Sequence, residues 1–288
     1  AIASQAKFHG FDPNEAVVQL RPREGEEALR TEDILQAIDE AGSSLALVLL
    51  GGVNYYTGQY FNLKEITAQA HKVGAFAGYD LAHAAGNIRL QLHDSGADFG
   101  VWCTYKYLNS GPGGISGAFV HERHAQNFDL PRFAGWWGHQ EDIRFLMDKQ
   151  FVPMEGAEGW QLSNAPILLM ASHKASLEVF DQAGMERLEE KSRKLTGYLE
   201  FLVEEFNQQQ EEMQIKVITP RSPEERGCQL SLVTSRNGKE LHRYISEQGV
   251  ISDWREPDVM RLAPVPLYNC FEDVYDFYEL LLKGASKM

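Results

Sequence analysis

The stretch AFAGYDLAHAAGNIRLQLHDSGADFGVWCTYKYLNSGPGGISGAFVHE, residues 75–122, decides the fold of this chain. It holds three short, mainly apolar runs, each of the length of one strand: 75–79, 98–104 and 115–120. The first run ends at Asp80, and the second ends at Tyr105-Lys106. Short apolar runs bounded by glycine and polar residues are typical of strands buried in a sheet.

The residues before this stretch alternate between helix and strand. The segment 31–41 (TEDILQAIDEA) carries apolar residues at helical spacing behind a threonine cap: Ile34, Leu35 and Ile38. The apolar run 45–50 ends in two glycines, which favours a buried parallel strand. Asn62 opens a segment that resembles a capping box, so a second helix is predicted to about Lys72. This alternation predicts an α/β fold with a mainly parallel sheet.

The character of the chain changes near residue 160. Two long helices are predicted over 165–184 and 185–206, followed by a polar loop at 208–212. Shorter elements follow: strands near 214–219, 228–234 and 250–263, and helices near 239–248 and 271–282. We therefore predict a large domain over 1–160. The interdomain helices and a smaller α+β domain are predicted over 161–288.

Composition narrows the classes of function. Asp and Glu outnumber Lys and Arg by 41 to 27, which gives a formal net charge of −14. Phosphate backbones and anionic lipids repel such a chain, so neither nucleic acid nor a membrane is an expected partner. The three cysteines are widely spaced, and no cluster of Cys and His suggests a metal site. They indicate a reducing, cytoplasmic compartment.

The number of predicted strands is small for a sheet of this kind. We count about four before residue 121, whereas open doubly wound sheets usually have five or more. The chain also begins at Ala1 and not at a methionine. We expect the N-terminal third of the protein to precede Ala1.

Two charged residues fall where ligands bind in α/β sheets, beyond the carboxyl ends of strands. Asp80 and Lys106 lie 106 − 80 = 26 residues apart, about one step from strand to strand. A lysine amine can form a Schiff base with pyridoxal 5′-phosphate, and a carboxylate can keep the pyridine nitrogen protonated. Taken alone, the same residues could be a surface ion pair, and the glycines of 109–114 could form an ordinary turn.

A wider set of motifs goes beyond this pair. The motifs DLAH and YKYLNSGPGG mark a superfamily of pyridoxal-phosphate enzymes, and GWWGH and MRLAPVPLYN narrow it further. In combination they resemble kynureninase, a family with the aspartate-aminotransferase fold and with class V aminotransferases as relatives. The resemblance extends over nearly the whole chain from residue 55 onward, and it is carried by the segments 55–62, 78–122, 132–139, 161–168, 225–232 and 260–269.

The resemblance implies how the cofactor is held. Lys106 matches the Schiff-base lysine, and Asp80 matches the partner of the pyridine nitrogen. Tyr105 matches a tyrosine that bonds the cofactor phosphate and is placed for proton transfer. His83 matches a residue beside the cofactor, although a buried structural histidine is an equal alternative. Relatives often carry serine where this chain has Gly51, so a phosphate hydroxyl is lost here or replaced by a backbone N–H.

The resemblance also implies how the substrate is held. Trp136 and Asn164 match residues that complete the phosphate and substrate pocket, across the interface of a homodimer. Without the resemblance, Trp136 reads as a core residue. Arg261 matches the arginine that binds the substrate α-carboxylate through a two-pronged contact. The alternative for Arg261 is a surface ion pair with one of the many carboxylates of this chain.

The function implied is hydrolysis of L-kynurenine, or of 3-hydroxykynurenine, to anthranilate or 3-hydroxyanthranilate and L-alanine. This reaction belongs to tryptophan catabolism and NAD biosynthesis. One rival is another class V enzyme, such as an aminotransferase or a cysteine desulfurase, but Cys228 and Cys270 fall in a predicted strand and at a helix start. The other rival is a catalytically silent scaffold. The presence of Asp80, Lys106 and Arg261 together argues against it.

Overall fold

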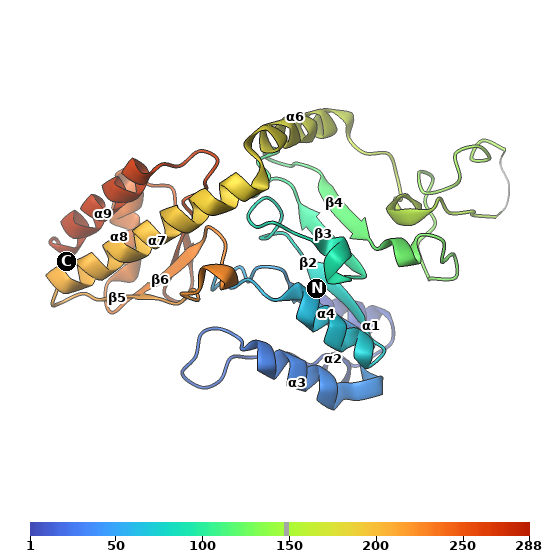
Figure 1. The fold of residues 1–288 in the computed structure, drawn as a ribbon, viewed down its shortest axis with the longest axis horizontal. Coiled ribbons are helices and arrows are strands. Elements are labelled where there is room, and N and C mark those ends of the chain that lie inside the picture. Colours follow the sequence, from blue (N-terminus) through green and yellow to red (C-terminus); the bar gives the residue numbers. More distant parts are fainter. Residues whose placement is uncertain (147–149) are drawn as a thin grey trace.

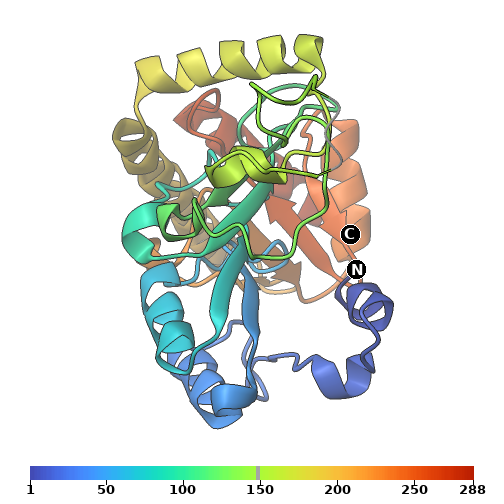
Figure 2. The same ribbon diagram turned by 90° about the vertical axis from the view of Figure 1, so that its right-hand side faces the viewer.

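The computed structural model describes residues 1–146 and 150–288, which form two sheets joined by two long helices (Figures 1 and 2). The strand order is β1-β2-β3-β4 in the first sheet and β5-β6-β8-β7 in the second. The first sheet contains β1 (Leu47–Gly51), β2 (Phe76–Asp80), β3 (Phe99–Cys103) and β4 (Ser116–Val120). The second contains β5 (Ile215–Val217), β6 (Leu230–Thr234), β7 (Asp253–Arg255) and β8 (Val259–Leu262). Among the described residues, no helix is long and apolar enough to cross a membrane.

The first sheet is mixed but mainly parallel. β1, β2 and β3 run parallel, and β4 pairs with β3 in the antiparallel sense. The register places Gly51, Asp80 and Val101 side by side. The carboxyl ends of the three parallel strands therefore meet at one edge of the sheet, where the polar residues of the sequence were expected.

Two helices cover one face of this sheet: α3 (Thr31–Ala41) and α4 (Leu63–Lys72). The buried residues of both helices share one core with the strands, which includes Ile34, Ile38, Ile66, Ala70, Val48, Ala77 and Tyr79. This core fixes the strands whose ends carry the polar residues.

The two helices begin in different ways. α4 begins where the sequence predicts, because the Asn62 side chain accepts a hydrogen bond from the backbone N–H of Glu65 at 3.2 Å. The threonine cap expected for α3 is wrong by one position. Thr31 is the first helical residue, and the cap position is held by Arg30, whose side chain makes no capping hydrogen bond.

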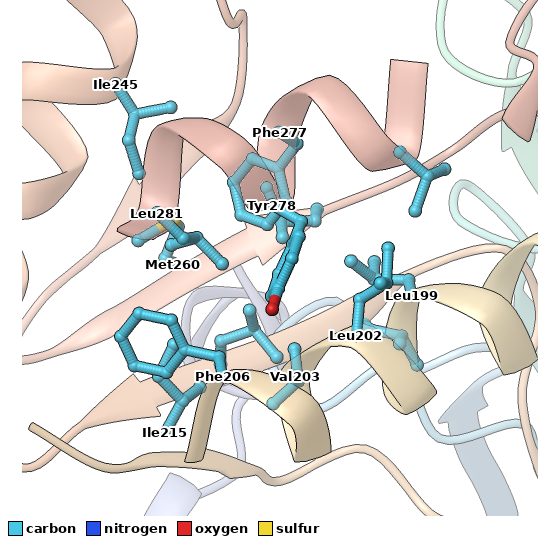
Figure 3. Packing of buried hydrophobic residues seen from close by; sticks show 14 of the residues in the cluster. Leu199, Leu202, Val203, Phe206, Ile215, Ile245, Met260, Phe277, Tyr278 and Leu281 are labelled. Atoms are coloured by element: carbon cyan, nitrogen blue, oxygen red, sulfur yellow. The ribbon is translucent and has the colours of Figure 1, made fainter. Parts of the chain in front are cut away.

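The two long helices, α6 (Ile167–Ala183) and α7 (Met185–Gln209), meet at Gly184, whose φ is 77°. α7 lies on the second sheet together with α8 (Gly238–Glu247) and α9 (Phe271–Ala285). Figure 3 shows side chains of α7 facing Phe277 and Tyr278 of α9. Each fully buried leucine or phenylalanine here contributes about 1.5–3 kcal/mol. The sequence predicts both helices, but the loop expected at 208–212 begins later, since α7 continues to Gln209 and its Nε2 donates to the Tyr278 hydroxyl at 2.9 Å.

The segment 54–60, which follows β1, joins the two sheets. Its backbone carbonyls accept hydrogen bonds from side chains of the second sheet and its flanks. Thr219 Oγ1 donates to the Thr57 carbonyl at 2.5 Å, and Ser231 Oγ donates to the Tyr56 carbonyl at 2.5 Å. The backbone N–H of Tyr60 donates to the Glu225 carbonyl at 2.8 Å. These bonds bring the end of β1 against the second sheet.

The described residues between β4 and α6 are largely irregular and extend beyond the first sheet at the right of Figure 1; Figure 2 views them from that side, in front of the sheet. Stacking of cations on rings holds part of it: the Arg132 guanidinium lies 4.4 Å from the Trp160 ring centroid, and that of Arg144 lies 4.8 Å from Trp137. The short helices of the molecule are α1 (Ile2–Phe8), α2 (Pro13–Ala16), α5 (Leu92–Ser95), η1 (Gly42–Ser44), η2 (Glu122–His124), η3 (Gly156–Trp160) and η4 (Pro223–Glu225).

A buried carboxylate, Asp98, ties several elements together at the edge of the first sheet opposite Asp80. Its side chain is 4 % exposed and accepts hydrogen bonds from Ala77 N at 2.7 Å, His71 Nε2 at 2.8 Å and His124 Nε2 at 2.8 Å. Burial alone would raise the pKa of Asp98, but these hydrogen bonds outweigh burial and lower it below the ordinary value.

We expect Asp98→Asn to lower the free energy of unfolding at pH 7 by roughly 1–3 kcal/mol, because the amide group cannot accept from both histidines. Since the pKa of Asp98 is lower in the folded state, its contribution is complete above the ordinary aspartate pKa and is lost as the pH falls below about 4. Urea unfolding at several pH values measures both effects. The exposed Asp94→Asn is the control, and equal losses in the two variants would contradict the prediction.

Candidate active site

Two charged side chains start from neighbouring strands at the carboxyl edge of the first sheet. Asp80 is the last residue of β2, and Lys106 follows the last residue of β3 by three positions (106 − 103 = 3). Gly51 ends β1 in register with Asp80. Each of these residues is therefore placed by a strand of the sheet, and only the short link after β3 needs separate support.

Hydrogen bonds hold that link and the loop after it, residues 104–115, in one shape. Thr104 Oγ1 donates to the Ile115 carbonyl at 2.5 Å and accepts from Ser110 Oγ at 2.5 Å. Two serines of α6 bind the loop from outside: Ser172 Oγ donates to the Ser110 carbonyl at 2.8 Å, and Ser176 Oγ donates to the Leu108 carbonyl. Because the loop is fixed at both ends, the backbone that carries Lys106 has little freedom.

The pKa of His83 depends on the charged side chains near this edge of the sheet. The pKa of His83 is lowered to about 4, first by burial and then by the positive charges of Lys106 and Arg261, while the Asp80 carboxylate opposes this shift. The ring of His83 lies between two tyrosine rings, with centroid distances of 6.3 Å to Tyr55 and 6.1 Å to Tyr107. Residues from both sheets thus act on one half-buried imidazole.

Three polar groups at this edge keep bonding capacity for a ligand. Nδ1 of His83 is buried and has no hydrogen-bond partner among the described residues. Asp80 Oδ1 accepts from Ala82 N at 2.9 Å, which leaves the second carboxylate oxygen available. Within the described part of the chain, the side chain of the half-buried Lys106 makes no hydrogen bond or ion pair, although its backbone carbonyl accepts from Asn109 N at 3.0 Å. A free amine, a half-used carboxylate and an unpaired imidazole nitrogen fit the cofactor expected from the sequence, which carries an aldehyde and a basic ring nitrogen.

Arg261 enters the site from β8, and its side chain is only 10 % exposed. Its Nε donates to Asp253 Oδ2 at 2.6 Å, Nη2 contacts the same oxygen, and Nη1 donates to the Tyr55 carbonyl at 2.6 Å. The ion pair named as the alternative for Arg261 therefore exists, with Asp253. The positive charge of Arg261 nevertheless helps to lower the pKa of His83, so Arg261 still contributes to the electrostatics of the site while it is paired with Asp253.

The sequence reasoning missed Asp253 and its second partner, Arg255, whose Nε lies 3.1 Å from Asp253 Oδ2. A signal for them exists in the segment 253–261 (DWREPDVMR). Two short apolar-polar strands around the turn residues Glu-Pro-Asp indicate a hairpin, and the hairpin register pairs Asp253 with Arg261. Cross-strand pairing of opposite charges follows from that register.

The structure does not bring every predicted site residue together. Trp136 and Asn164 lie on the projecting segment between β4 and α6, and both are exposed. Trp136 packs edge-on against Phe145, with 5.4 Å between ring centroids. Within the described residues, neither forms a hydrogen bond or ring contact with Asp80, His83 or Lys106. Tyr105 is next to Lys106 but exposed, and its hydrogen bond with Cys103 raises the pKa of the phenol.

A close backbone contact fixes the turn after β2 against the Lys106 loop. Gly86 has a φ of +80°, and a Cβ there would lie 2.8 Å from the carbonyl carbon and oxygen of Tyr107. We expect Gly86→Ala to be strained twice, by its backbone angle and by this contact. Gly74→Ala is the matched control, because Gly74 has a φ of +87° and open space around it.

The control should lose about 1–2 kcal/mol of unfolding free energy from the backbone angle alone. Gly86→Ala should lose at least about 1 kcal/mol more from overpacking. Chemical denaturation of both variants checks the difference. Equal losses would mean that the Tyr107 backbone moves aside without cost.

Comparisons with known proteins bear on the fold and the family of this chain. The family described as Kynureninase C-terminal domain matches residues 188–281. The fold is that of class V aminotransferases and cysteine desulfurases, as predicted. A cysteine desulfurase from Thermococcus onnurineus has a TM-score of 0.77 at 18% identity, over 99% of this chain and 69% of that structure. An alanine–glyoxylate aminotransferase from Nostoc sp. has a TM-score of 0.68 at 18% identity, over 89% of this chain and 65% of that structure.

Sequence relatives are much closer. Kynureninase from Flavobacterium johnsoniae is 55% identical over 98% of this chain and 66% of its own length. Kynureninase from Myxococcus xanthus is 56% identical over 98% of this chain and 65% of its own length. Kynureninase from Mus musculus is 50% identical over 98% of this chain and 61% of its own length. The chain thus spans 61–66% of the length of these three relatives. With half or more of the residues identical across nearly its whole length, this chain belongs to the kynureninase family.

Proposed function

We propose that the protein to which this chain belongs hydrolyses L-kynurenine, or its 3-hydroxy derivative, with pyridoxal 5′-phosphate as cofactor. The products would be L-alanine and anthranilate or 3-hydroxyanthranilate. The observation that carries the proposal is that Asp80 and Lys106 lie at one edge of the first sheet, while Arg261 of the second sheet donates to the carbonyl of Tyr55, whose ring centroid lies 6.3 Å from that of His83. The charges of all three also shift the pKa of His83. An amine, a carboxylate and a guanidinium at one place suit an amino-acid substrate, and the chain is 50–56% identical to kynureninases from several organisms.

When bound, the cofactor would supply an electron sink for the charge that develops on the substrate beside its amino group. Lys106 Nζ would hold the cofactor by its aldehyde. The same nitrogen would also be placed to take a proton from the substrate Cα. The unpaired oxygen of Asp80 would hold the proton on the pyridine nitrogen. Gly51, without a side chain, would offer only its backbone to the phosphate.

Two further side chains would assist: His83 would pack beside the cofactor ring, and Tyr105 would donate a proton. With a pKa of about 4, His83 is neutral at pH 7, so it can lie beside a protonated ring without repelling it. The raised pKa of Tyr105 keeps its hydroxyl protonated at neutral pH. Tyr105 would bond the cofactor phosphate and return a proton to the substrate carbon after the carbon–carbon bond breaks.

A homodimer would complete the site. Trp136 and Asn164 lie apart from Lys106 in this chain, so they would serve the site of a second copy. Large apolar side chains are exposed on the same projecting segment and at the start of α6: Phe133, Trp136, Phe145, Leu146, Leu162, Ile167 and Leu168. Exposed apolar groups gathered in this way are typical of a surface that another protein covers.

The desulfurase alternative is not favoured by the cysteines of this chain. Burial raises the pKa of Cys228 to about 12, so this thiol cannot act as a nucleophile at neutral pH. Cys270 is the N-terminal cap of α9. All three cysteines are free, which suits the reducing cytoplasm that we propose as the location. Tryptophan catabolism and NAD biosynthesis are the roles that this reaction would serve.

The first test concerns Lys106 in the full-length protein. We expect Lys106→Ala to lower kcat for L-kynurenine by at least about 10³-fold, because both the cofactor link and the base at Cα are lost. Borohydride reduction followed by peptide mapping should place the cofactor on Lys106 in the wild type. The exposed Lys64→Ala is the control. Substantial cleavage by the Lys106 variant would refute the role of this lysine.

The second test concerns Arg261. Arg261→Lys keeps the charge but cannot form a two-pronged contact, so we expect kcat/KM for L-kynurenine to fall about 10- to 100-fold. The melting temperature should hardly change, because an ammonium can still pair with Asp253. Arg236→Lys, at an exposed pair with Glu212, serves as the control. Near-wild-type kinetics would return Arg261 to the role of a structural ion pair.

A further inference from the structure

Asp253, Arg255 and Arg261 form a cluster of charges, in which Arg261 is paired with an aspartate before any substrate binds. Asp253 already occupies Arg261, since Oδ2 accepts from Nε at 2.6 Å and also contacts Nη2. A neutral Arg–Asp pair has little attraction left for the carboxylate of a substrate. An arginine that binds a carboxylate beside an aspartate therefore needs a compensating charge.

Arg255 supplies that charge. Its Nε lies 3.1 Å from the same Asp253 oxygen, so the cluster carries two positive charges and one negative charge, a net charge of +1. Asp253 and Arg255 share strand β7, and the antiparallel register sets Asp253 opposite Arg261 on β8. The positive charge of Arg255 also helps to lower the pKa of His83, so Arg255 contributes to the electrostatic potential at the site.

Arg261 also keeps the donors that a carboxylate needs. A guanidinium has five N–H groups. Asp253 accepts the one on Nε, and the Tyr55 carbonyl accepts one on Nη1 at 2.6 Å. The ion-pair contact of Asp253 with Nη2 takes up at most one more, so at least two of the five remain, one on each Nη atom. Asp253 and the Tyr55 carbonyl thus orient the Arg261 guanidinium, while N–H groups on its two Nη atoms remain available to a ligand.

We propose that Asp253 and Arg255 are positioning residues for the substrate carboxylate: Asp253 orients Arg261, and Arg255 cancels the charge of Asp253 so that Arg261 still attracts an anion. The proposal rests on the proposed function, and it adds two residues that set the affinity of the same site. Neither would touch the cofactor or the reacting atoms. Their effect should therefore appear in binding and not in the chemical step.

The test is a cycle of charge-changing variants in the full-length holoenzyme. Arg255→Gln leaves a cluster with no net charge, so KM for L-kynurenine should rise roughly 5- to 10-fold, with kcat nearly unchanged. Adding Asp253→Asn restores a net charge of +1 and keeps an acceptor oxygen for Arg261. The double variant should therefore bind better than Arg255→Gln alone. Asp253→Asn by itself should not raise KM.

Two controls separate charge from structure. The dissociation constant of L-alanine, measured by calorimetry, should follow the same order as KM, and that of the decarboxylated amine of kynurenine should be the same in every variant. High salt should reduce the differences, because about 1 M salt shortens the screening length to about 3 Å. Arg236→Gln controls for the loss of an exposed arginine just after strand β6.

The outcomes are distinct. An unchanged KM in Arg255→Gln, a higher KM in Asp253→Asn, or a double variant that binds no better than Arg255→Gln would each overturn the proposal. A wild type that cleaves kynurenine while the variants behave in one of these ways leaves the proposed function intact. A wild type that neither cleaves kynurenine nor binds L-alanine would overturn both.

Discussion

The site depends on the junction between the segment 54–60 and the second sheet. Asp80 and Lys106 are fixed by the first sheet, whereas Arg261 belongs to the second. A set of hydrogen bonds brings them within electrostatic reach of His83. These bonds run from side chains in the second part of the chain to three successive backbone carbonyls, those of residues 55, 56 and 57. Without this junction each sheet would present half of a site, and neither half could hold both ends of an amino acid.

Much of the fold could be predicted from local patterns. The helix at 31–41 has the bounds that its apolar spacing indicates, and the Asn62 side chain caps α4 as expected. The strands of the first sheet were predicted to within one or two residues, because each is a short apolar run between polar or glycine residues. The strand order of the second sheet, in which β8 lies between β6 and β7, could not be predicted, since it depends on contacts that are distant in the sequence.

The candidate site shows the same division. Asp80 and Lys106 could be predicted because strand ends of a parallel sheet gather at one edge. Asp253 and Arg255 were missed because a charged strand in an acidic chain resembles solvated surface, and only the hairpin register shows that Asp253 lies opposite Arg261. The roles of Trp136 and Asn164 stay predictions. A single chain places them on a projecting segment, apart from Lys106, and only the homodimer that we propose would give them a site.

The two sides of the junction should tolerate amino-acid substitutions to different degrees. Its acceptors are backbone carbonyls, so the side chains of Tyr55 and Tyr56 can change without removing a single acceptor. The donors to these carbonyls are side chains, and each must be kept or replaced by another donor of similar length: Thr219, Gln229, Ser231 and Arg261. Gly58 is the exception on the acceptor side, since a Cβ there would lie 3.0 Å from the Gln229 carbonyl. Substitutions that preserve this architecture should therefore accumulate on one side of the junction while the other side hardly changes.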